Sequence, residues 1–175
     1  MAGIGIIGIG NVLMGDDAAG PYAVKLIESR YALPEGVSAV EAGTPGFELA
    51  AIVGAFDVAL IVDAVRADGP PGRLVRFDRA AITATGGDGA VGPHEPGLRE
   101  ALFVLEASGA GPREVLLFGV IPGRVDGGIG LTPEVHEALD AVVEEVVSEV
   151  RRRGITLEPL PAPAAPDLWW ERGAR

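Results

Sequence analysis

The chain has 175 residues and a mass of 17.9 kDa, a length that favours a single domain of about 100–200 residues. Its formal net charge of −11 disfavours binding to nucleic acids, because that affinity depends on Lys and Arg. The absence of cysteine excludes disulfides, thiolate nucleophiles and iron–sulfur sites, so any metal must be held by oxygen atoms or by the two histidines.

The first predicted element is a buried strand over residues 3–10, an apolar run that ends in glycines. No basic segment precedes this run, so it is not a secretory signal. No apolar run in the chain reaches the roughly 18–20 residues that a membrane-spanning helix needs. We therefore expect a cytoplasmic protein that does not interact with membranes.

The same run contains the text pattern G-x-G-x-x-G, which is typical of dinucleotide binding. That pattern must follow a strand and open a helix, whereas here it lies inside the predicted strand, so we reject it. The loop over residues 11–19 holds two adjacent acids, Asp16 and Asp17, and a helix is predicted to begin between Asp17 and Gly20. One acid is enough to cap this helix, which leaves the other available for chemistry.

A second strand is predicted over residues 37–41, followed by a helix that runs from Thr44, as its N-cap, to about residue 54. A third, strongly apolar strand over residues 56–62 is closed by Asp63. A carboxylate at that depth is costly unless it is paired, hydrogen-bonded or metal-bound, although capping of the next turn is an alternative role.

The rest of the chain continues the alternation of strands and helices up to Gly154, which is predicted to end the last helix. We therefore divide the chain into a domain over residues 1–154 and a loosely held, Pro-rich tail over residues 155–175. The intervening predictions are an edge strand over 73–77, a mobile loop over 80–92, a helix over 97–108, a buried strand over 114–120 and a long helix that opens at Thr132–Pro133.

This order predicts an α/β domain with a mostly parallel sheet between layers of helices. Functional residues in such sheets gather at the carboxyl ends of the strands, where Asp17 and Asp63 are both expected. His94, between prolines in a long loop, is a plausible third ligand for a divalent metal, whereas His136 is expected on a helix surface. No serine lies in a G-x-S-x-G context, which disfavours a serine hydrolase.

Five segments together resemble the hydrogenase maturation proteases, the endopeptidases that trim the large subunit of nickel–iron hydrogenases. The resemblance spans residues 3–153 and keeps the order of the motifs. The segments are GIGNVLMGDDAAG (8–20), EAGTPGFEL (41–49), IVDAV (61–65), GPHEPGL (92–98) and GVIPGRVDGGIGLTPEV (119–135).

The resemblance implies a three-layer α/β/α sandwich with a twisted, mostly parallel five-stranded sheet. It implies an endopeptidase that removes the C-terminal extension of the large-subunit precursor after nickel insertion. The metal-contacting trio of the family matches Asp17, Asp63 and His94, although the first position is often Glu. Nickel is expected to be carried by the precursor, and the enzyme is expected to be a monomer.

How such a site cleaves a peptide is left open between two mechanisms. Nickel could polarise the scissile carbonyl or activate water. Alternatively, nickel serves only for recognition, and the carboxylates of Asp17 and Asp63 activate water, which is the mechanism that we favour. Asn11, Gly43 and Thr44 are candidates for hydrogen bonds to the substrate backbone.

Three alternatives are weighed against this interpretation. The first is a peptidase resembling the spore germination proteases, and the second is a nickel-sensing accessory protein without catalysis. The third, a nucleotide-binding α/β domain, is disfavoured by the missing phosphate loop and by the negative charge.

Overall fold

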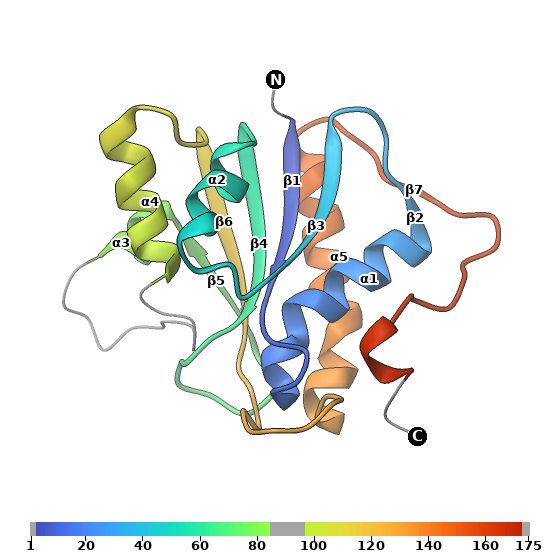
Figure 1. Cartoon of the computed structure of the whole chain (residues 1–175). Coiled ribbons are helices and arrows are strands. Elements are labelled where there is room, and N and C mark those ends of the chain that lie inside the picture. The colour runs from blue at the N-terminus through green and yellow to red at the C-terminus, as the bar shows by residue number, and fades with distance from the viewer. Residues whose placement is uncertain (1–2, 85–96, 173–175) are drawn as a thin grey trace.

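The protein is a three-layer α/β/α sandwich around a mostly parallel five-stranded sheet, as predicted (Figure 1). The computed structural model describes residues 3–84 and 97–172. The strand order is β3-β1-β4-β6-β5, and only β5 runs antiparallel to its neighbour. The five strands are β1 (Ile4–Ile9), β3 (Val37–Gly43), β4 (Val58–Ala64), β5 (Leu74–Asp78) and β6 (Glu114–Val120).

Helices cover both faces of the sheet. The longer ones are α1 (Ala19–Arg30), α4 (Gly97–Ser108) and α5 (Pro133–Arg152), and α2 (Leu49–Gly54) and α3 (Arg79–Thr83) are short. The predicted bounds of α4 and β6 are confirmed to the residue. No helix in the described part of the chain is long and apolar enough to cross a membrane.

The burial of the strands follows their positions in the sheet. The central strand β4 is buried along its whole length, and β1 likewise, because helices cover both of their faces. The strand β5 lies at the edge of the sheet and contains only half-buried and exposed residues, which confirms the predicted edge strand.

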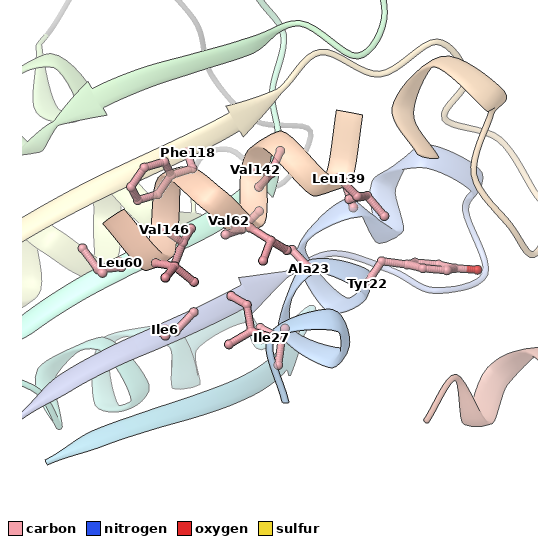
Figure 2. Packing of buried hydrophobic residues seen from close by; sticks show 14 of the residues in the cluster. Ile6, Tyr22, Ala23, Ile27, Leu60, Val62, Phe118, Leu139, Val142 and Val146 are labelled. Carbon is pink, nitrogen blue, oxygen red and sulfur yellow. The ribbon is translucent and has the colours of Figure 1, made fainter. Parts of the chain in front are cut away.

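Two apolar clusters fill the spaces between the layers. On one face, Ile6, Leu60 and Phe118 of the sheet pack against α1 and α5 (Figure 2). On the other face, residues such as Ile7 and Ile61 pack against α2 and α4. Full burial of one such side chain contributes about 1.5–3 kcal/mol, so the sandwich holds the central strands rigidly.

The start of α1 lies directly on the carboxyl ends of β1 and β4. A Cβ atom at Gly20 would lie 2.3 Å from the carbonyl oxygen of Ile9 and 2.4 Å from that of Val62. Only glycine permits so close an approach of helix to strand backbone. This contact fixes the position of the 3₁₀ turn η1 (Gly15–Ala18), which precedes α1 and carries both acids of the first motif.

Two local predictions are wrong. Thr44 does not cap a helix, because Gly46 takes a positive φ of 55° and the chain forms a 3₁₀ turn, η2 (Gly46–Glu48), before α2 begins. The predicted mobile loop over residues 80–92 begins instead with α3, whose N-cap Asp78 accepts a hydrogen bond from the Ala81 amide at 2.8 Å. Residues 85–92 of that prediction lie outside the described residues.

The C-terminal segment is packed onto the domain, which corrects the expectation of a loosely held tail. A short antiparallel pair joins β2 (Tyr31–Ala32) to β7 (Glu158–Pro159). Further along, the 3₁₀ turn η3 (Trp169–Glu171) brings the buried Trp170 edge-on to Tyr22 of α1, with ring centroids 5.1 Å apart. The segment has no periodic pattern, so the sequence alone did not show that Trp170 belongs to the core.

Candidate functional site

The candidate site lies at the carboxyl edge of the two central strands β1 and β4. These strands are adjacent and parallel, with Gly8 opposite Val62. Asp63 follows Val62 inside β4 and is only 4 % exposed. The strand thus continues one residue beyond Asp63, whereas the sequence predicted that it ends before this residue.

Asp17 is the second carboxylate at this edge. It lies in η1 and is 2 % exposed, and η1 contacts β4. Its Oδ2 atom accepts a hydrogen bond from the backbone N–H of Asn11 at 2.8 Å, so its orientation is tied to the end of β1. Two buried carboxylates therefore come from adjacent strand ends of one sheet edge, where α/β proteins place their chemistry.

Asp16 has a different role from the one predicted. We expected one acid of this pair to cap the helix, but neither η1 nor α1 has a side-chain cap. The carboxylate of Asp16 instead accepts hydrogen bonds from the backbone N–H groups of Gly123 and Arg124 at 2.8 and 2.9 Å. It also accepts from the N–H and the hydroxyl of Thr132 at 2.6 and 2.8 Å. Since these partners are more than 100 residues away in sequence, no local pattern could reveal them.

The candidate substrate-binding residues lie at the same edge. Asn11 follows β1, and its Oδ1 atom accepts a hydrogen bond from the Leu13 N–H at 3.0 Å. Gly43 ends β3 and accepts a hydrogen bond from the Gly10 N–H at 2.9 Å through its carbonyl oxygen. Thr44 comes next and is exposed. The structure brings all three to the ends of the neighbouring strands β1 and β3, and their role in substrate binding stays a prediction.

His94, the third member of the predicted trio, lies outside the described residues. Within residues 3–84 and 97–172, no group of three or more His, Asp or Glu side chains is arranged to hold a metal ion. His136 lies on α5 and is exposed, as expected. The described part of the site thus consists of the two carboxylates and their supporting loops.

Exposed apolar side chains accompany the segments that follow the strands at this edge. Leu13 follows β1, Phe47 follows β3, and Val125 and Ile129 follow β6; their exposed fractions range from 37 % for Ile129 to full exposure for Phe47. We call these four residues the apolar rim. Exposed apolar side chains in the loops around a site can supply contact area for a bound partner.

The C-terminal segment reaches the same side of the molecule at β3. The indole N–H of Trp169 donates a hydrogen bond to Glu41 Oε1 at 3.3 Å, and the ammonium group of Lys25 lies 3.4 Å from Glu41 Oε2. The hydrogen bonds to Glu28 and Glu41 outweigh the effect of burial and raise the pKa of Lys25. The site is therefore flanked at β3 by a fixed ionic contact.

The chemistry available to this arrangement is that of two buried carboxylates. They can supply oxygen ligands to a divalent cation, and an ionised carboxylate can also accept a proton from water. The chain has neither a thiolate nor a serine in a nucleophile motif, so the acids are the candidates for activating a nucleophile.

Comparisons of the sequence and of the fold with known proteins all find hydrogenase maturation proteases. A family model described as hydrogenase maturation protease matches residues 21–149. The hydrogenase 2 maturation protease of Escherichia coli is 33 % identical over 155 residues, which cover 88 % of this chain and 94 % of that protein. The solved structure of the E. coli maturating endopeptidase HybD matches with a TM-score of 0.80 at 33 % identity, covering 90 % of this chain and 97 % of that one. The structure of a NiFe hydrogenase maturation protease, HybD, from Thermococcus kodakarensis matches with a TM-score of 0.69 at 26 % identity, covering 84 % of this chain and 98 % of that one.

Proposed function

Since the chain belongs to the family of hydrogenase maturation proteases, and is thus a peptidase, we propose that it removes the C-terminal extension of a nickel-loaded hydrogenase large-subunit precursor. The observation that carries the proposal is the pair of buried carboxylates, Asp17 and Asp63, at adjacent strand ends of a fold shared with these endopeptidases. The family match favours this function over a spore germination protease, a passive nickel sensor or a nucleotide-binding domain.

The chain's own residues would supply the base for hydrolysis. An ionised carboxylate of Asp17 or Asp63 accepts a proton from water while the water oxygen attacks the scissile carbonyl carbon. The C–N bond then breaks and the proton passes to the leaving nitrogen. The products are a new C-terminal carboxylate on the large subunit and a free extension peptide with a new amino terminus.

Nickel enters this proposal as part of the substrate. Asp17, Asp63 and His94 would contact it with two carboxylates and an imidazole, a donor set suited to a borderline divalent metal. The chain has no cysteine, so any sulfur ligands must come from the precursor. The enzyme would thus complete the coordination shell of an ion that the precursor carries, and recognise the loaded state through it.

The surroundings of the acids suit a polypeptide substrate. Asn11, Gly43 and Thr44 lie where an extended substrate segment would run beside the ends of β1 and β3. The apolar rim offers contact area for the folded part of the precursor. These features support a protein substrate at this edge.

The test is cleavage of a nickel-loaded precursor by wild type and by Asp17→Asn, Asp63→Asn and His94→Ala. We expect each variant to keep the fold, as circular dichroism would show, and to lose about 10²–10⁴-fold in rate through loss of the base or of metal recognition. Asp140→Asn, an exposed acid on α5, is the matched control and should cleave normally. Full activity in any of the three variants would remove that residue from the mechanism, and an inactive wild type would contradict the proposed function.

A further inference from the structure

The motif over residues 119–135 contains a long loop that has no part in the chemistry proposed above, yet it is joined to the site. Its section 123–132 runs along the segment 11–16 that leads into η1. The Gly15 N–H donates to the Gly128 carbonyl at 2.8 Å, and the Gly128 N–H donates to the Leu13 carbonyl at 2.9 Å. Between them, Met14 and Gly128 form an isolated parallel bridge. We call residues 11–16 and 123–132 the two-loop unit.

Asp16 is the side chain at the centre of this unit. It is fully buried, and its carboxylate accepts all four of its hydrogen bonds from Gly123, Arg124 and Thr132. Its own N–H donates to the Arg124 carbonyl at 2.9 Å, so backbone and side chain hold it to the same loop. Hydrogen bonds from several N–H and O–H donors are what an ionised, buried carboxylate requires.

We propose that Asp16 is a positioning residue for the carboxylate of Asp17. The inference rests on the proposed function, because it concerns the orientation of an acid that activates water or contacts the nickel. The 3₁₀ turn that carries Asp17 has no side-chain cap, so the hydrogen bonds of Asp16 to residues 123–132 fix where the turn begins. The next residue, Asp17, is then held with its Oδ2 atom on the Asn11 N–H.

The geometry explains why an acid, rather than an amide, stands at position 16. Four donors converge on its two oxygens, with two N–H groups and a hydroxyl on Oδ2. An asparagine has only one acceptor oxygen. Its NH₂ group would replace the other oxygen and would point at N–H or O–H donors, with which it cannot form a hydrogen bond. Asp16→Asn keeps the side-chain volume but breaks part of the unit, and the turn that carries Asp17 is expected to shift. A displacement of about 1 Å can cost on the order of 10²-fold in rate.

The test compares Asp16→Asn with Glu149→Gln, which alters another buried carboxylate, near the end of α5, that accepts hydrogen bonds from Arg76, Arg152 and Arg153. With nickel-loaded precursor, we expect Asp16→Asn to lower kcat about 10- to 100-fold with little change in KM. Glu149→Gln should lower the melting temperature and leave kcat unchanged. The amide resonance of Asn11 in a ¹⁵N–¹H spectrum, which reports on the Asp17 contact, should move in Asp16→Asn and stay in Glu149→Gln.

If Asp16→Asn does not fold, two smaller substitutions at Thr132 test the same proposal. Thr132→Val removes one hydroxyl donor and should lower kcat about threefold, while Thr132→Ser should restore it. The proposal is overturned if folded Asp16→Asn, or Thr132→Val in its place, keeps the wild-type kcat and Asn11 resonance. It is also overturned if their loss of kcat is matched by Glu149→Gln. An inactive wild type would instead reject the proposed function. In that case the Asn11 amide resonance would still show whether Asp16 determines the position of the Asp17 carboxylate.

Discussion

At the scale of single residues, Asp16 and Asp17 are neighbours with the same chemistry and nearly the same burial, yet their partners differ. Asp16 binds a loop more than 100 residues away, whereas Asp17 contacts the end of β1. The sequence identified the pair, but its premise that one acid caps the helix was wrong, and the role of Asp17 in the chemistry stays a prediction. The sequence could not show what the other acid does, because the donors for Asp16 come together only when β6 and α5 are in place.

The hydroxyl of Tyr22 gives a prediction on pH dependence. Burial, as the larger cause, and the hydrogen bond to Glu171 together raise the pKa of Tyr22 from 10.0 to about 12. The unfolded chain loses this proton near pH 10, so the stabilisation is fully present below pH 10 and is lost as pH rises toward 12. We expect the free energy of unfolding of wild type to fall toward that of Tyr22→Phe over this range.

The measurement is urea unfolding of both proteins at several pH values between 8 and about 12, with the difference between them plotted against pH. Taking the difference removes the titration of Lys and of Tyr31, which both proteins share. A difference that does not change across this range would contradict the contact between Tyr22 and Glu171.

At the scale of elements, the strands and the longer helices were predictable because their burial leaves a pattern in the sequence. A strand buried on both faces is a continuous apolar run, and a helix buried on one face has apolar residues at a period of 3.6. The helix α4 and the strand β6 follow this rule to the residue. The start of α2 was not predictable from its Thr-Pro signal, because Gly46 turns the chain first. The C-terminal segment was missed since it docks through isolated contacts such as that of Trp170, without any period.

The packing of the C-terminal segment onto the domain gives a prediction on stability. Trp170 is 4 % exposed and packs on Tyr22, so Trp170→Ala should lower the free energy of unfolding by about 3–5 kcal/mol, the cost of truncating a buried Trp. The matched control is Trp169→Ala, since this side chain is 53 % exposed and should cost much less. Chemical denaturation of the two variants checks this. Equal losses, or no loss in Trp170→Ala, would mean that the segment is not part of the core.

At the scale of the whole molecule, the sheet brings residues 17 and 63 to one edge because β1 and β4 are adjacent and parallel. The alternation of strands and helices was enough to predict this, and the order of five motifs was enough to indicate the family. The joining of residues 11–16 to residues 123–132 was not predictable, because it depends on backbone hydrogen bonds between distant loops.

The proposed function requires that this protein cleave a precursor only when that precursor carries nickel. The direct measurement is incubation of the purified protein with nickel-loaded and with nickel-free large-subunit precursor, followed by mass spectrometry of the large subunit. We expect the loaded precursor to lose its C-terminal extension and the nickel-free precursor to stay intact. Cleavage of both at equal rates would contradict recognition through nickel, and an intact loaded precursor would contradict the proposed activity itself.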